Sequence, residues 1–442
     1  MSALLDARAQ RTVLVGMVAY IALGAFESLA VSTAMPTVAA ELDGLRLYTY
    51  AFAATAGAGV LGMLVGGRWT DRAGPAAPLW AGIGMFLGGL LVAGLAPSMG
   101  VLLSGRVLQG TGAGLESVAL YVLVARVFPE ESRARVFAWF AAAWVVPGVV
   151  GPLVAGLVTQ HLGWRWVFLA VPALALPALL ALRPALVAAR GADDGPRTAA
   201  GAAGADDAGD APPARVRDVA VPVLRGDRGL GTVVQVRALM SAAFVGAEVL
   251  VPLALVRERG LSPALAGAVL TLHVLGWSAG SWLRGRGVAA LSHAAYLRLG
   301  GVSLTLGIAG IALVTLPGLP LPVAATPWVL AGLGMGLSYP TLNLLALELA
   351  PGGGQGTAMS AMQVADAAAA TLALSGTGAL LWTLHDRIGL AAYAVCLAGA
   401  AVLALTAAVR AGRTAPAVTK SLARPSSLRE AGDESAAAPA SL

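Results

Sequence analysis

Apolar runs of roughly 20 residues recur from Val13 to Val409, and short segments rich in arginine, proline or glycine separate them. A helix of about 20 apolar residues crosses the hydrocarbon core of a bilayer, whereas a membrane-spanning strand needs only about ten. The pattern therefore predicts an all-α polytopic membrane protein with about twelve transmembrane helices. The predicted spans begin near Val13, Tyr48, Leu79, Val101, Val136, Trp166, Val233, Leu261, Ala294, Pro327, Ala358 and Leu390.

The apolar pattern is interrupted between Arg183 and Gly231, where Ala, Gly, Asp and Pro dominate and no run can cross a bilayer. Six predicted spans lie on each side of this interruption. Paired halves of this kind are typical of many secondary transporters. The predicted domains are an N-terminal six-helix half at 1–184, a disordered cytoplasmic linker at 185–231, a C-terminal six-helix half at 232–411 and a disordered cytoplasmic tail at 412–442.

Closely spaced glycines occur within several predicted spans, where small residues let helix backbones approach each other in lipid. The spacing predicts helix interfaces at some of these pairs, although chance pairs are expected in a chain with 56 glycines. The pairs are Gly62 and Gly66, Gly84 and Gly88, Gly110 and Gly114, and Gly332 and Gly336.

The overall composition agrees with a membrane protein and argues against an enzyme. Of 442 residues, 58% are hydrophobic and only 12% are charged, which is too apolar for a soluble globular protein. No phosphate-binding Gly-rich loop ending in Lys and Ser/Thr is present, which argues against an ATP-driven pump. The four histidines are scattered, so neither a metal site nor a cofactor is expected. The single cysteine, Cys396, excludes an internal disulfide framework.

The basic residues indicate topology rather than a nucleic-acid partner. The net charge is +6, but the arginines are spread over the loops between spans instead of gathering on one domain. With a cytoplasmic N-terminus, the outer loops keep only Arg46, Arg165, Arg257, Arg259 and Arg387. The inner segments then hold Arg8, Arg11, Arg68, Arg72, Arg126, Arg133, Arg135, the arginines from Arg183 to Arg237, Arg284, Arg286, Arg298, and those from Arg410 to Arg429. This asymmetry predicts a multi-pass protein of the cell (inner) membrane with both termini in the cytoplasm.

The loop after the second predicted span, GGRWTDRAGPAAP, places Gly67, Asp71, Arg72 and Gly74 at the spacing Gly-x-x-x-Asp-Arg-x-Gly. Asp71 can accept charge-assisted hydrogen bonds and face a helix N-terminus, and the glycines allow close approach and a tight turn. The spacing resembles the signature loop of the major facilitator superfamily, which latches neighbouring helices. A proline and two alanines stand where that family places basic residues, which implies a weaker latch.

The fourth predicted span contains Arg106, Gln109 and Gly110 in an Arg-x-x-Gln-Gly-x-Gly pattern that resembles a motif of the same superfamily. In exporters of that family, the arginine is associated with proton coupling. A guanidinium inside a membrane costs roughly 3 kcal/mol or more unless it meets water, a carboxylate or backbone carbonyls. Arg106 therefore needs a partner, unless it snorkels to the interface.

The fifth predicted span carries Pro147, Gly151, Pro152 and Gly156, which resemble the fifth-helix motif of the drug:proton antiporter branch, with Pro147 in place of its first glycine. Proline and glycine allow a helix to flex at a defined place. The resemblance implies antiport, whereas a kink used only for packing is the alternative. The segments ESLAVSTAMPTVAAEL and HLGWRWVFLAVP also resemble that branch, which commonly has an aspartate at the place of Glu27.

Several carboxylates lie inside predicted spans and must face a cavity or a partner rather than lipid. Glu27 is the leading candidate for a proton-titrating or cation-contacting site, with a structural hydrogen bond to a neighbouring helix as the alternative. Glu116 lies about 15 Å along one helix from Arg106, so the two cannot pair directly, and Glu116 is instead a candidate for lining the central cavity. Glu248 and Asp366 are the corresponding candidates in the second half.

Other polar side chains inside the second half are further candidates. His273 suits either a proton relay or a hydrogen bond to a neighbouring helix. Gln363 lies one turn before Asp366. Tyr339 and Asn343 are candidates for substrate contact beside a helix break expected at Pro340.

These observations predict a twelve-helix major facilitator fold with a central cavity, present as a monomer. The resemblance implies export of small amphipathic or cationic compounds, such as drugs or secondary metabolites, in exchange for protons by alternating access. A proton symporter or facilitator for a small nutrient is one alternative, and a non-transporting receptor or scaffold is another. The Ala- and Arg-rich composition with a single lysine suggests a GC-rich bacterial genome.

Overall fold

The computed structural model describes residues 7–193, 228–286, 291–316, 318–350 and 355–414. In these ranges all regular secondary structure is helical, which confirms the predicted all-α class. The helices are α1 (Ala7–Glu41), α2 (Tyr48–Ala73), α3 (Ala76–Gly94), α4 (Met99–Val127), α5 (Glu130–Ala142), α6 (Val145–His161), α7 (Arg165–Asp193), α10 (Leu230–Leu253), α11 (Pro263–Arg286), α12 (His293–Ile311), α13 (Leu321–Ala325), α14 (Trp328–Glu348), α15 (Gln355–Ile388) and α16 (Ala391–Arg410).

Eleven helical segments of the described chain are long and apolar enough to cross a membrane. The fifth predicted span differs, because it consists of two helices, α5 and α6, separated at Ala143 and Trp144. The prediction of one continuous span from Val136 is therefore wrong. Pro147 explains the break, since its ring clashes with the carbonyl four residues earlier, which belongs to Ala143. The eleven segments, together with this pair of helices, correspond to the twelve predicted spans.

The boundaries of the linker lie partly in the described chain. Helix α7 continues to Asp193, beyond the predicted boundary at 184, and α10 begins at Leu230. Residues 194–227 of the predicted linker and 415–442 of the predicted tail lie outside the described residues. The domain boundaries therefore stay predictions.

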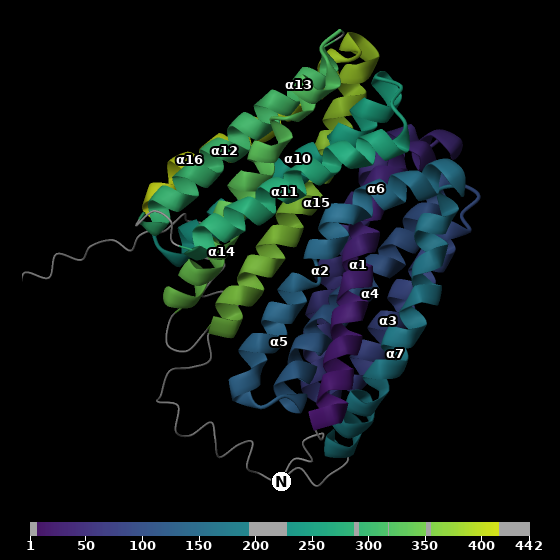
Figure 1. Ribbon diagram of the computed structural model, residues 1–442, viewed down its shortest axis with the longest axis vertical. Helices are drawn as coiled ribbons and strands as arrows, with labels where there is room; N and C mark the ends of the chain where they lie inside the picture. Colours follow the sequence, from purple (N-terminus) through teal and green to yellow (C-terminus); the bar gives the residue numbers. More distant parts are fainter. Residues whose placement is uncertain (1–6, 194–227, 287–290, 317, 351–354, 415–442) are drawn as a thin grey trace, which may run out of the picture.

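Helices α1–α7 and α10–α16 form two bundles that lie side by side (Figure 1). Glycines allow close helix packing inside each bundle. A Cβ atom on Gly114 of α4 would lie 2.7 Å from the backbone nitrogen of Met63 on α2, and one on Gly336 of α14 would lie 2.8 Å from that of Ser281 on α11. Side chains larger than glycine would therefore push these helices apart. In contrast, a Cβ atom on Gly84 would meet nothing within 4 Å.

The two bundles touch near one end, which we call the contact end and which holds the loops at 42–47, 162–164 and 259–262. The Tyr48 hydroxyl on α2 donates to the carbonyl of Val249 on α10 at 2.7 Å. The Thr271 hydroxyl on α11 donates to the carbonyl of Val149 on α6 at 3.4 Å. The opposite end, where α7 ends and α10 begins, is called the linker end.

Two further contacts belong to the contact end. Gly156 of α6 packs directly against the backbone of Ala264 on α11, and an exposed ion pair of 3.4 Å joins Arg46 to Asp386. Gly156 lies in the last two turns of α6, Ala264 is the second residue of α11 and Asp386 lies in the last turn of α15, so these two contacts lie at the contact end.

Candidate functional site

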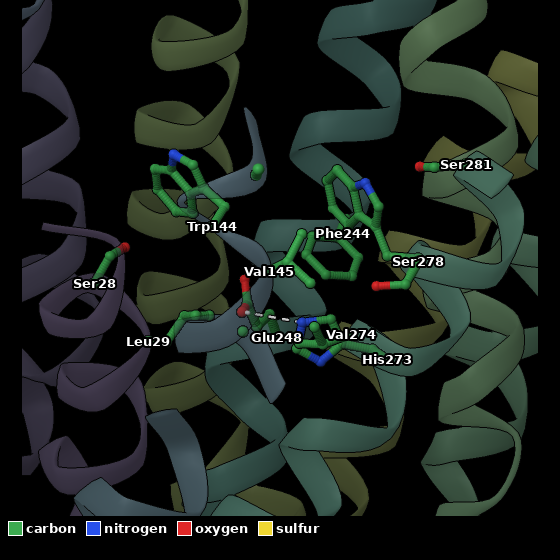
Figure 2. Close-up of a pocket in the computed structure, with 13 residues that line it drawn as sticks. Ser28, Leu29, Trp144, Val145, Phe244, Glu248, His273, Val274, Ser278 and Ser281 are labelled. Atoms are coloured by element: carbon green, nitrogen blue, oxygen red, sulfur yellow. Dashed lines mark ion pairs between the residues drawn. The ribbon is translucent and has the colours of Figure 1, made fainter. Parts of the chain in front are cut away.

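A cavity of about 660 Å³ lies between the two bundles. Its walls come from four places: Ser28 and Leu29 on α1, the α5–α6 junction, Phe244 and Glu248 on α10, and the face of α11 from His273 to Ser281 (Figure 2). On α6, α10 and α11 alike, the lining residues lie on the linker side of the hydrogen bonds between the bundles. The volume is in the range of sites that hold drug-sized molecules.

The wall formed by α10 and α11 is aromatic. The Phe244 ring stacks on Trp328 of α14 with centroids 5.7 Å apart and meets the edges of His273 and Trp277 at 5.2 and 5.7 Å. Such rings offer large, rigid apolar surface and can also attract cations through their faces. The wall therefore suits a flat apolar or cationic ligand.

Glu248 places a carboxylate in this wall, opposite His273 (Figure 2). The Trp328 indole N–H donates to Nδ1 of His273 at 3.1 Å, so Nδ1 acts as an acceptor. The imidazole is therefore neutral and carries its proton on Nε2, which lies 3.8 Å from Oε1 of Glu248. The protein partner of Glu248 is thus an uncharged N–H group. His273 thus bonds to a neighbouring helix, as one of the two interpretations expected, and its role as a proton relay stays a prediction.

The second charged group lies within the N-terminal bundle. Arg106 of α4 is 4% exposed, and its guanidinium binds Oε1 of Glu27 on α1 at 2.9 Å and the side-chain oxygen of Gln109 at 2.6 Å. Its Nε also donates to the carbonyl of Ala51 on α2 at 3.3 Å. Arg106 therefore has the partner that its depth requires, and the snorkelling interpretation is wrong. Glu27 itself does not line the cavity, but its neighbour Ser28 does.

The third charged group, in the C-terminal bundle, includes a residue that sequence reasoning missed. Arg237 had the pattern of an inner-loop arginine, but it lies two turns inside α10, where its guanidinium binds Asp366 of α15 at 2.7 Å and Asn343 of α14 at 3.1 Å. It also stacks on the Tyr339 ring at 3.6 Å, and the Tyr339 hydroxyl donates to Asp366 at 3.1 Å. The signal that could have led to Arg237 was Asp366, an aspartate inside a predicted span with no basic residue near it in the sequence. Gln363 is exposed on α15.

Tyr339 and Asn343 thus contact the ion pair of Arg237 and Asp366, and the helix break expected beside them is absent. Helix α14 runs unbroken through Pro340. Proline deprives the carbonyl four residues earlier, in Gly336, of its helical donor. The Ser281 hydroxyl of α11 donates to that carbonyl at 3.3 Å, so the neighbouring helix replaces the lost bond.

Glu116 does not line the cavity, contrary to expectation. Its carboxylate accepts a 2.6 Å hydrogen bond from the Tyr20 hydroxyl on α1 and lies among apolar side chains of α1, α3 and α4. Helices α1 and α4 both belong to the N-terminal bundle. No pattern in the sequence pointed to Tyr20 as its partner.

The signature loop lies at the linker end. Helix α2 ends at Ala73, and Gly74 follows with φ 73°, a conformation that favours glycine, so the expected tight turn is present. Asp71 and Arg72 are exposed there. Gly67 has open space where its Cβ would be, so the close approach expected at that position is absent.

The other motif residues lie at helix contacts. Gly110 of α4 packs on the backbone of Thr55 in α2. Pro147 and Gly151 are buried in α6, and the carbonyl of Pro152 packs directly against Gly267 of α11. Pro152 and Gly156 therefore contact α11 across the two bundles, whereas Gly151 faces Phe26 and Leu29 of α1 within its own bundle. Among the described residues, no group of three or more His, Cys, Asp or Glu is placed to hold a metal ion.

Comparison with known proteins places these features in a family. The sequence profile of the Major Facilitator Superfamily matches residues 12–374, which is more than half of the chain. Multidrug resistance protein 3 of Bacillus subtilis is 29% identical over 156 residues, or 35% of this chain and 30% of that protein. The MFS efflux transporter aclA of Aspergillus oryzae is 36% identical over 141 residues, or 31% of this chain and 25% of that protein. The chain thus spans less than a third of either relative.

Among solved structures, a POT family transporter in complex with a thioalcohol-conjugated peptide has a similar fold. The TM-score is 0.67 at 15% sequence identity, with 90% of this chain and 94% of that chain covered. At this identity the similarity concerns the fold alone.

Proposed function

The chain belongs to the Major Facilitator Superfamily, and is therefore a multi-pass membrane transporter rather than an enzyme; within that family, we propose that it exports small amphipathic or cationic compounds, such as drugs or secondary metabolites, in exchange for protons. The two relatives named as a multidrug resistance protein and an efflux transporter support this direction of transport. The proposed substrate class follows from the cavity lining, which combines an aromatic wall with the negative charge of Glu248.

The observation that carries the proposal is the charge balance of the intramembrane carboxylates. Glu27 and Asp366 are each neutralised by an arginine, and Glu116 is sealed away from the cavity beside a tyrosine. Glu248 differs from them, since it lines the cavity and faces a neutral imidazole. A charged carboxylate in an apolar wall is unfavourable in free energy unless a proton or a cation neutralises it. A proton and a cationic cargo therefore compete for Glu248, and this competition is the basis of exchange.

The arrangement of the two bundles supports alternating access. The bundles touch at the contact end, and the cavity lies on the linker side of those contacts. By the distribution of arginines we assign the linker end to the cytoplasm, with both chain termini on that side of the inner membrane. The described arrangement is then the inward-facing one, in which cargo enters from the cell. Rocking of the bundles about the α6–α11 contact would expose the cavity to the outside.

The buried pair of Glu27 and Arg106 is proposed as the coupling element. It lies beside cavity-lining Ser28, so protonation of Glu27 would leave the positive charge of Arg106 unbalanced close to the cavity. That charge would repel a cationic cargo and favour its release. We propose that a single chain carries out the whole cycle.

The proposal is tested in proteoliposomes that contain a pH-sensitive dye, with tetraphenylphosphonium as the lipophilic cation. The wild-type protein should move protons against the direction of cation movement, and Glu248→Gln should abolish that coupling. Glu348→Gln serves as the matched control, because Glu348 is half-exposed at the end of α14 and away from the cavity. Coupling that survives in Glu248→Gln would contradict the proposal, and cation movement without proton flux in the wild type would indicate a facilitator.

A further inference from the structure

Tyr48, the first residue of α2, is fully buried between the two bundles at the contact end. Its hydroxyl donates a 2.7 Å hydrogen bond to the backbone carbonyl of Val249 on α10. The bonds from Thr271 and from Arg46 that also join the bundles are both 3.4 Å long. The Tyr48 bond is thus the best formed of the three.

This hydrogen bond is made next to the cavity carboxylate. Val249 directly follows Glu248 on α10, so one turn of helix carries both the cavity carboxylate and the acceptor for Tyr48. The Tyr48 phenol is also close enough to Glu248 and to Tyr393 of α16 to interact electrostatically with both. The titratable groups around this turn are therefore Tyr48, Tyr393 and, from α11, His273.

The backbone hydrogen bonds of α10 are interrupted in the same region. Pro252 has no N–H group, so the carbonyl of Glu248, four residues earlier, lacks its helical donor. One turn later the backbone widens into a π-helical turn at Ala254–Glu258, a feature that is frequent at functional sites. A helix bends most readily where its hydrogen-bond ladder is interrupted. The turn that carries Glu248 and Val249 is therefore a deformable part of α10.

We propose that Tyr48 is a positioning residue that couples the occupancy of Glu248 to the opening of the contact end. The inference rests on the proposed function, because it takes Glu248 as the group that exchanges a proton for cargo. When that exchange moves the Glu248 turn, the carbonyl of Val249 moves with it. The Tyr48 hydrogen bond must break before the bundles separate at the contact end, so its strength sets how often they separate.

The first measurement is the distance between spin labels on cysteines introduced by Arg46→Cys and Asp386→Cys, in a chain where Cys396→Ala removes the native thiol. Tyr48→Phe deletes only the hydroxyl and should raise the ratio of separated to closed contact ends about fivefold, the effect of one lost hydrogen bond. Tyr50→Phe, made two residues further along the same helix, should leave the ratio unchanged. An unchanged ratio in Tyr48→Phe would overturn the proposal.

A double-substitution cycle separates coupling from simple packing. Glu248→Gln should change the ratio of separated to closed contact ends in the wild-type background. In the Tyr48→Phe background, the logarithm of this ratio should change by less than about half as much. Additive effects would show that Tyr48 does not sense Glu248, even if proton exchange through Glu248 is intact in the transport assay. If Tyr48→Phe fails to fold, Pro252→Ala provides the test, since restoring the missing donor should reduce separation. Unchanged separation in Pro252→Ala would then overturn the proposal.

Discussion

Removal of one partner from the buried pair of Glu27 and Arg106 should destabilise the protein strongly. The two side chains are 4% and 5% exposed and are held at 2.9 Å, so neither can recover hydration when the other is lost. Glu27→Leu leaves Arg106 with only Gln109 and one backbone carbonyl as acceptors. Breaking a buried pair in this way costs about 3–5 kcal/mol, because the remaining charge stays buried without compensation.

The exposed pair of Arg46 and Asp386 provides the matched control. These side chains are 79% and 62% exposed at a distance of 3.4 Å, so Asp386→Leu should change stability by only about 0–1 kcal/mol. The double substitution Glu27→Leu with Arg106→Leu should recover much of the loss, since apolar residues of similar size often replace a buried ion pair without cost.

The native chain offers a simple assay for these variants. Cys396 is the single cysteine of the sequence and is buried in α16, so a thiol-reactive fluorophore reports unfolding. The expected order of melting temperatures is wild type, Asp386→Leu, the double variant and Glu27→Leu, from highest to lowest. If Glu27→Leu melts together with Asp386→Leu, the reasoning about burial and charge in this bundle is refuted.

Three further outcomes follow from the geometry. Trp328→Phe keeps an aromatic ring but removes the N–H that sets the His273 tautomer. This substitution should weaken the binding of a fluorescent lipophilic cation about fivefold, and unchanged binding would contradict this role. Binding of the cation should strengthen as pH rises, because a proton competes for Glu248, and should become independent of pH in Glu248→Gln; equal pH profiles in isothermal titration would contradict the competition. Gly336→Val should abolish the monodisperse peak in size-exclusion chromatography because its Cβ meets a helix backbone, whereas Gly84→Val should elute like the wild type; equal profiles would refute the packing argument.

The charged groups of the two bundles are arranged differently with respect to the cavity. The pairs Glu27–Arg106 and Arg237–Asp366 are internal to their bundles and balanced in charge. Glu248 lines the cavity between the bundles, and in the described part of the chain it faces the imidazole of His273. In the proposed cycle, a proton or cation that binds Glu248 would act at the surface along which the bundles move, whereas the pair of Arg237 and Asp366 would hold its own bundle together during that movement.

The sequence alone determined the fold class and the family resemblance of this protein. Apolar runs long enough to cross a bilayer are local features, and so are the glycine and proline positions of the motifs. The turn at Gly74 and the glycine contacts at Gly110 and Gly336 followed from such local rules. The need for a partner at Arg106 was also predictable, since a buried guanidinium is costly wherever its helix packs.

Which partner each polar group meets was decided only by the tertiary structure. Arg237 and Asp366 are 129 residues apart, and Trp328 and His273 are 55 apart, so no local pattern links them. The break before α6 and the continuity of α14 through Pro340 show the same limit, because only the neighbouring helix, through Ser281, supplies the hydrogen bond that replaces the one lost at Pro340. Helix formation depends on residues near in sequence, whereas charge compensation depends on residues near in space.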